Sequence, residues 1–110
     1  MKKFKLFIGS EWVEPEDGKY FTSYCPATGE PLAELASASA NDVDKAVQAA
    51  KKAFPEWSKT DGDVRADLML KALSLFKARM KEFAELEAKD VGKPIKETMG
   101  TDLPYAFRAM

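Results

Sequence analysis

DVRADLMLKALSLFKARMKEFAELEAKDV, residues 63–91, is the longest helical pattern in the chain. In its first part, apolar side chains recur at spacings of one, three and four residues, which places them on one face of a helix. These side chains are Leu68, Met69, Ala72, Leu73, Phe76 and Met80. Lys71, Lys77 and Lys81 fall mostly on the other side. The pattern predicts an amphipathic helix whose apolar face lies on something larger.

The helical pattern changes phase beyond Met80. We therefore expect a break near Lys81, followed by a short third helix up to Asp90. Gly92 supplies the left-handed residue that ends many helices. Pro94 suits the first position of a fourth helix, because its missing N–H would be unpaired there anyway.

The predicted fourth helix meets two interruptions, Gly100 and Pro104. Both residue types weaken a helix interior. The sequence then stops at Met110, inside an aromatic-rich run with no helix-ending signal. We expect the natural polypeptide to continue beyond this point.

Another helix is predicted before residue 60. Ser39-Ala-Asn-Asp42 resembles a capping box in which Asp replaces the usual Glu. One stripe of this helix carries Val43, Ala46, Val47, Ala50 and Phe54, and its many small residues favour close packing against another layer. We expect Pro55 to end this helix, and Asp61 or Asp63 to cap the helix that follows.

The first 37 residues carry strand patterns separated by turns. Residues 4–8 alternate as a half-buried strand does, and Gly9-Ser10 is a two-residue hairpin loop with Gly in first place. Residues 20–24 and 31–36 predict two further strands. Between them, residues 25–28 suit a type I turn, with Gly29 as a left-handed residue.

The order of elements predicts an α+β chain, with β hairpins in residues 1–37 and three to four helices in residues 38–110. A length of 110 residues is that of one domain. With 45% apolar and 32% charged residues, the composition is typical of a globular protein.

The charge balance disfavours two classes of partner. Lys and Arg number 17 against 18 Asp and Glu, so no net field would attract nucleic acid or an anionic membrane. No apolar run approaches the roughly 20 residues that span a bilayer. A single cysteine excludes an internal disulfide, and we expect a cytoplasmic protein.

The residues alone name no reaction. There is no His, and the glycines fit neither dinucleotide nor P-loop spacing. Cys25 lacks a sequence neighbour that would activate it, so a structural role is favoured. Asp61, Asp63 and Asp67 hint at a calcium loop but lack EF-hand spacing, so helix capping is favoured.

Charged residues on the helices indicate solvent exposure and pairing. Glu82, Glu85, Glu87 and Lys89 are typical of a solvated helix face. Arg65 lies beside the positive end of the main helix, which is unfavourable for a cation, so we expect it to pair with a carboxylate or with carbonyl groups elsewhere.

Several local signatures occur in an order that resembles one family. They are Ile8-Gly-Ser-Glu-Trp12, Gly18-Lys-Tyr-Phe21, Pro26-Ala-Thr-Gly-Glu30, Asp42-Val-Asp-Lys-Ala-Val47 followed by Ala50, Phe54 and Trp57, then Arg65, Leu68, Leu86 and Glu87, and Gly92-Lys-Pro94. Together they resemble the N-terminal segment of the NAD(P)-dependent aldehyde dehydrogenase superfamily, from about Leu6 to Asp102. Each signature is weak alone, and their shared order carries the resemblance.

The resemblance implies an oxidoreductase that converts aldehydes to carboxylic acids with NAD or NADP, on an α/β Rossmann-like fold. Its members use a Cys thiolate, a Glu and a glycine-containing dinucleotide turn, all downstream of the part matched here. No catalytic or cofactor-binding residue is therefore assigned in this chain, and we expect it to be inactive alone. Cys25 stands where the family usually has Asn, so it is a departure from the family and not the nucleophile.

The resemblance also implies partners. Residues 38–110 would cover the cofactor-binding domain supplied by the remainder of the same polypeptide, and the full-length family forms homo-oligomers. Many members bind a monovalent cation, K⁺ or Na⁺, through two backbone carbonyls and a carboxylate. By position these match Ser23, Tyr24 and Asp102. The alternative is that Asp102 merely caps the residues around Leu103 and Pro104.

Two other functions stay open on the sequence alone. One is a stand-alone structural or interaction module derived from the same family. The other is a small cation- or ligand-binding domain. If the apolar stripes lack their normal partner layer, the isolated chain should self-associate or be partly disordered.

Overall fold

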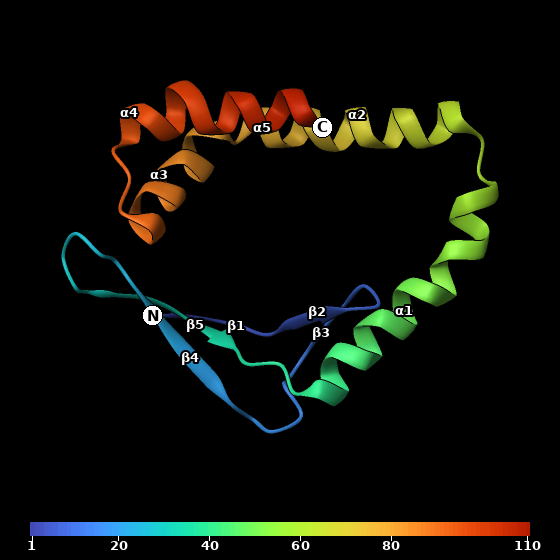
Figure 1. Cartoon of the computed structure of the whole chain (residues 1–110), viewed down its shortest axis with the longest axis horizontal. Helices are drawn as coiled ribbons and strands as arrows, with labels where there is room; N and C mark the ends of the chain where they lie inside the picture. Colours follow the sequence, from blue (N-terminus) through green and yellow to red (C-terminus); the bar gives the residue numbers. More distant parts are fainter. The chain divides into compact units, whose positions relative to one another are not determined.

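The computed structural model describes residues 1–110 and is an α+β fold, as predicted (Figure 1). The strands are β1 (Lys2–Phe4), β2 (Leu6–Ile8), β3 (Glu11–Val13), β4 (Tyr20–Tyr24) and β5 (Pro31–Ala36). The helices are α1 (Ala40–Lys59), α2 (Gly62–Ala78), α3 (Met80–Val91), α4 (Ile95–Glu97), the π-helical turn η1 (Thr98–Asp102) and α5 (Leu103–Ala109).

The chain forms two compact units. The first unit contains residues 1–24 and 31–59, and the second contains residues 25–30 and 60–110. Helix α1 goes with the strands, and the turn between β4 and β5 goes with the later helices.

The strands of the first unit form two small sheets. One has the order β1-β5-β4, in which β1 runs parallel to β5 and β4 runs antiparallel to it. The other is the β2–β3 hairpin. The single strand predicted over residues 4–8 is wrong, because the chain passes from one sheet to the other at Lys5. Parallel pairing of β1 with β5 joins residues about thirty positions apart, which no local pattern reveals.

The β2–β3 hairpin has the predicted two-residue loop, but not the predicted Gly-first geometry. Gly9 and Ser10 both have positive φ, 60° and 69°. Positive φ at both central residues is the type I′ arrangement, whose twist matches that of the flanking strands. The second hairpin is confirmed, since β4 and β5 have the predicted bounds and Gly29 adopts φ 73°.

Helix α1 passes the residue predicted to end it. Pro55 lies inside the helix, which continues to Lys59, so that prediction is wrong. Proline removes one amide donor, which leaves the carbonyl of Lys51 without its helical partner. This part of the helix is exposed throughout, so water can bond the carbonyl instead.

The main helical stretch breaks at Arg79, two residues from the predicted position. Asp61 stands at the N-cap of α2 but makes no side-chain capping hydrogen bond, so the predicted cap by Asp61 is wrong. Asp63 lies in the first turn, near the positive end of the helix, as expected. No residue of α2 is buried.

The predicted end of the third helix is confirmed, whereas the fourth helix begins at a different position from the one predicted. Gly92 caps α3 in the left-handed conformation, with φ 79°. Pro94 is the N-cap of α4, one position earlier than predicted. Gly100 and Pro104 do not stop the helix. Gly100 lies inside η1, where the helix widens, and Pro104 occupies the first turn of α5, where proline is tolerated.

Little of the chain is buried. Ala84, Thr98 and Phe107 are buried in the second unit, whereas many large apolar side chains stay exposed. Helices that combine the length and apolarity needed to cross a bilayer do not occur in the structure.

Candidate functional site

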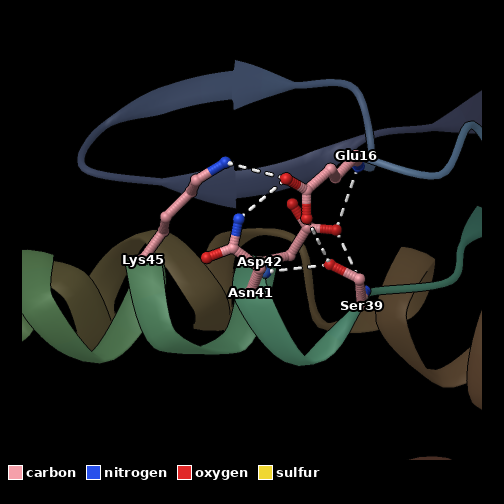
Figure 2. Close-up of polar contacts among 5 residues, drawn as sticks. All are labelled: Glu16, Ser39, Asn41, Asp42 and Lys45. Atoms are coloured by element: carbon pink, nitrogen blue, oxygen red, sulfur yellow. Dashed lines mark hydrogen bonds and ion pairs between the residues drawn. The ribbon is translucent and has the colours of Figure 1, made fainter.

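Asp42 anchors the start of α1 (Figure 2). Its Oδ2 accepts hydrogen bonds from the backbone N–H groups of Ser39 and Glu16, each at 3.0 Å. Ser39 Oγ accepts in return from the Asp42 N–H at 3.1 Å. This is the predicted capping box, with the shorter Asp side chain in the place of Glu. Only 3% of Asp42 is exposed.

These contacts fix Asp42 as an anion. The amide of Ser39, followed by that of Glu16, lowers the pKa of the Asp42 carboxyl. A carboxylate held by two amides is a weak proton acceptor. Asp42 therefore serves the architecture of the helix start and is not a general base.

Glu16 ties the loop after β3 to the same helix start. Its carboxylate accepts hydrogen bonds from Ser39 Oγ at 3.0 Å and from Asn41 Nδ2 at 2.7 Å. Lys45 lies 4.0 Å from it, on the next turn of the helix (Figure 2). Sequence reasoning missed Glu16, because its partners are more than twenty positions away.

A shallow apolar groove of about 390 Å³ lies between β2 and α1 in the first unit. Its lining is Leu6, Phe7, Ile8, Ala38, Asp42, Val43, Ala46, Val47 and Ala50. Most of the predicted α1 stripe therefore does face a strand layer. Val43 is still half exposed, at 53%. With Asp42 as its sole titratable residue, the groove offers apolar surface and no reactive group.

Ser23 and Tyr24, two of the predicted cation ligands, lie where the β4–β5 pairing is irregular. Ser23 pairs with Ala33 and Tyr24 with Pro31, and the register shifts between them. Pro31 has no N–H and cannot donate to the backbone of β4. An irregular backbone at this point fits the idea that its carbonyls serve other partners.

Asp102, the third predicted ligand, lies in the second unit at the end of η1 and has another partner. Lys93 Nζ donates to Asp102 Oδ2 at 2.8 Å. This hydrogen bond raises the pKa of Lys93. No three His, Cys, Asp or Glu side chains converge as a metal-binding group. The cation site thus stays a prediction, and the partner of Asp102 in this structure is Lys93.

Cys25 opens the turn between β4 and β5 and is buried, with 8% exposed. Its carbonyl accepts hydrogen bonds from the amides of Thr28 and Gly29, at 3.3 and 2.7 Å. The Thr28 hydroxyl, followed by the amides of Thr28 and Ala27, lowers the pKa of the Cys25 thiol. This set of contacts closes a turn and supplies no base, so the structural role remains the favoured interpretation.

The same turn fits tightly against the end of α3. A Cβ atom added at Gly92 would lie 3.2 Å from Cβ and 3.3 Å from Cγ of Pro26. Two of the sequence signatures, the turn that begins at Pro26 and Gly92-Lys-Pro94, are therefore in contact. Thr98 connects α3 and α4. Its hydroxyl lies within hydrogen-bond distance of the carbonyl oxygens of Ala84, at 3.0 Å, and Ile95, at 3.1 Å.

The pairing predicted for Arg65 does not involve its Nε. Its Nε is buried and has no hydrogen-bond acceptor. A buried donor without a partner is unfavourable by about 1–3 kcal/mol, so such groups are rare in protein interiors. Arg65 belongs to α2, the helix with no buried residue.

Sequence reasoning found most of these positions but not their partners. Lys93 was visible only as part of the Gly92-Lys-Pro94 signature, and its nine-residue separation from Asp102 follows no helical period. Thr98 gave no signal at all. The charged face of α3 is as predicted, with exposed pairs between Arg79 and Glu82 and between Lys81 and Glu85.

Comparison with known proteins gives consistent matches. The model of the aldehyde dehydrogenase family matches residues 12–110. The chain is 40% identical over 106 residues to an aldehyde dehydrogenase of Paracoccus denitrificans, and 38% identical over 105 residues to aldehyde dehydrogenase B of Escherichia coli. Each alignment covers 96% of this chain but only 21% and 20% of those two proteins.

A solved structure agrees with the sequence matches. The chain is similar to the NAD⁺ complex of an aldehyde dehydrogenase from Bacillus cereus, with a TM-score of 0.91 and 36% identity. That match covers 96% of this chain and 22% of the other. The chain therefore spans about a fifth of the length of the relatives it matches.

Proposed function

Because the chain belongs to the aldehyde dehydrogenase family, we propose that it is the N-terminal segment of an enzyme that oxidises aldehydes to carboxylic acids with NAD or NADP. The activity is that of the longer polypeptide. In this proposal the enzyme is cytoplasmic and homo-oligomeric, and residues 38–110 cover its cofactor-binding domain. The stand-alone interaction module is not favoured by any contact in the structure.

The residues present support an inactive segment. Aldehyde oxidation by this family needs a reactive thiolate, a base that activates water, and a site for the dinucleotide. The only thiol is Cys25, which is buried in a turn. The six glycines do not form a dinucleotide-binding fingerprint, so the chain does not fit NAD or NADP by itself.

The observation that carries the proposal is the open face of α2. Leu68, Met69 and Leu75 are 51%, 50% and 62% exposed. Side chains of this size normally lie inside a protein, and a contiguous apolar face marks an interaction surface. The buried, unpartnered Nε of Arg65 on the same helix indicates that a hydrogen-bond acceptor comes from the same missing layer.

The first test is an assay of the 110-residue chain. We expect no aldehyde-dependent formation of NADH or NADPH with either dinucleotide and a panel of aldehydes. An intact aldehyde dehydrogenase in parallel reactions shows that the assay works. Turnover by the chain that disappears in Cys25→Ala would contradict the proposal, because the chemistry would then lie within these residues.

The second test uses the full reading frame that contains residues 1–110. We expect its product to reduce NAD or NADP in the presence of an aldehyde. A reading frame that ends at residue 110, or a longer product with no such activity, would refute the proposal.

A further inference from the structure

The three-stranded sheet of the first unit has two outer strands, and they differ in charge. The strand order β1-β5-β4 leaves one side of β1 and one side of β4 without a neighbouring strand. β1 carries Lys2 and Lys3, and Lys5 follows it directly. Lysines on an outer strand oppose pairing with a strand of another chain. β1 is therefore protected against such pairing.

β4 has no such protection. Its five residues, Tyr-Phe-Thr-Ser-Tyr, include neither a charged residue nor proline. Aromatic residues and threonine are enriched in strands. Phe21 and Tyr24 are 54% and 57% exposed. An uncharged outer strand with exposed aromatic side chains is a template to which a further strand can be added.

The backbone bonds at the two ends of β4 show which of its groups face outward. Lys19, just before the strand, and Cys25, just after it, both bond toward the β5 side, at 2.9 Å in each case. In an antiparallel pair, residues that bond to the partner strand alternate with residues whose N–H and C=O point away from it. The irregular pairing skips one residue of β5 and none of β4, so the alternation along β4 is unbroken. The outward groups therefore belong to Tyr20, Thr22 and Tyr24.

These three residues are arranged symmetrically about Thr22, so a second copy of β4 can pair with the first. In an antiparallel pair with a two-fold axis at Thr22, each Thr22 bonds with the Thr22 of the other copy, and each Tyr20 bonds with Tyr24. This register brings no charges together and places aromatic side chains opposite each other, which is favourable. The same arrangement of two β1 strands would bring lysines together.

We propose that two copies of this chain associate through antiparallel pairing of their β4 strands, centred on Thr22. The outer edge of β4 is then occupied by a second copy, and the two three-stranded sheets become one continuous sheet. The inference concerns only residues of the first unit and does not depend on the proposed enzymatic activity.

The test is sedimentation velocity of the 110-residue chain carrying Leu68→Lys and Leu75→Lys, which reduce the contribution of the apolar face of α2. We expect this protein to form dimers. Thr22→Lys and Thr22→Glu, added separately, each place two like charges across the two-fold axis and should raise the dissociation constant of the dimer several-fold. An equimolar mixture of the two variants should recover the association, because lysine then faces glutamate.

Two further variants separate strand pairing from folding. Thr22→Pro removes the outward amide and should also weaken the dimer, while proline is tolerated where the N–H of an outer strand faces solvent. Thr22→Val keeps the amide and the strand propensity and should leave the dimer unchanged. Circular dichroism checks that each variant is folded. If Thr22→Pro does not fold, the mixture of the two charged variants still tests the pairing.

Four results would overturn the proposal. The starting protein could stay monomeric at every concentration, or its dimers could be unchanged by both charged variants at Thr22. Failure of the mixture to recover association would mean that Thr22 does not face itself across the axis. If Thr22→Lys in the full reading frame lowered stability but left the assembly unchanged, the edge of β4 would be covered by a strand of the same polypeptide.

Discussion

Helices α1 and α2 begin in opposite ways. At α1, the carboxylate of Asp42 is buried and joins two amides, and Ser39 returns a bond to the helix. At α2, Asp61 stands at the N-cap, as Ser39 does at α1, but makes no side-chain capping bond, and Arg65 has a buried Nε with no acceptor. The start of α1 is complete within the chain, whereas the start of α2 still lacks partners.

The difference distinguishes the polar groups that find their partners within the chain from the apolar surface that the chain leaves exposed. The contacts made by Asp42, Gly92 and Thr98 all lie within the chain. The apolar face of α2 and the shallow groove between β2 and α1 are not covered. The chain therefore holds its local geometry at these positions while its large apolar side chains on α2 stay exposed.

Replacing Asp42 with alanine should have the largest effect. The change leaves the part-buried amides of Ser39 and Glu16 without their acceptor and removes the carboxylate half of the capping box of α1. Amide hydrogen exchange in residues 39–46 should accelerate strongly. Asp61→Ala is the matched control and should leave exchange at the start of α2 nearly unchanged. Similar responses at the two helices would break the comparison.

Replacing Gly92 with alanine should have the next largest effect on stability. Alanine must adopt positive φ, which is unfavourable by roughly 1–2 kcal/mol, and its Cβ would press on Pro26 at 3.2 Å. Urea unfolding followed by circular dichroism should show the loss. Gly100→Ala has no neighbouring atom within 4 Å and should change stability by less than about 0.5 kcal/mol. Equal losses of stability in the two variants would argue against close packing of Gly92 on Pro26.

Thr98 gives a smaller and more local effect. Thr98→Val keeps the shape of the side chain but removes the hydroxyl that bonds the carbonyl oxygens of Ala84 and Ile95. We expect a loss of about 1 kcal/mol in urea unfolding, and recovery of most of it in Thr98→Ser. A valine variant as stable as the original would mean that the contact of residue 98 with α3 and α4 is held by packing alone.

The start of α1 should also be sensitive to acid. The pKa of Asp42 is lowered from its ordinary value of 3.8, so its contribution is present above that value and is lost as pH falls through the lower, folded-state pKa. Exchange protection at the start of α1, corrected for the intrinsic pH dependence of exchange, should stay constant from neutral pH down to about pH 5 and fall below about pH 4. In Asp42→Asn this local acid response should be absent.

Arg65 should give the smallest effect in the isolated chain. Arg65→Met removes a buried donor that has no acceptor, so stability should change by less than about 0.5 kcal/mol or even increase. The same substitution in the full reading frame should be clearly destabilising, because there the acceptor would be present. Equal effects in the two contexts would mean that α2 is not completed by the remainder of the polypeptide.

Local sequence patterns were sufficient to predict the structure where the interacting residues are close in sequence. The capping box of Ser39 and Asp42, the left-handed Gly92 and the bounds of β4 and β5 all depend on neighbours within a few positions. The same reasoning was wrong at Pro55, because an exposed helix can give one carbonyl to water and continue. It was also wrong at Asp61, where a favourable residue type makes no bond.

Partners far away in sequence could not be predicted. The bonds from Glu16 to α1, the parallel pairing of β1 with β5, and the ion pair between Lys93 and Asp102 depend on how the chain folds back. The predicted ligands Ser23, Tyr24 and Asp102 came from family resemblance alone. Resemblance supplied the positions of Lys93 and Asp102 but not the hydrogen bond between them.

Sedimentation velocity of the 110-residue chain tests most directly whether its apolar faces belong to an interface. We predict concentration-dependent self-association, which should be weaker when the exposed Leu68 and Leu75 of α2 are both replaced by lysine. A chain that stays monomeric at every concentration and unfolds in one sharp transition would contradict the account, because its faces would then need no partner.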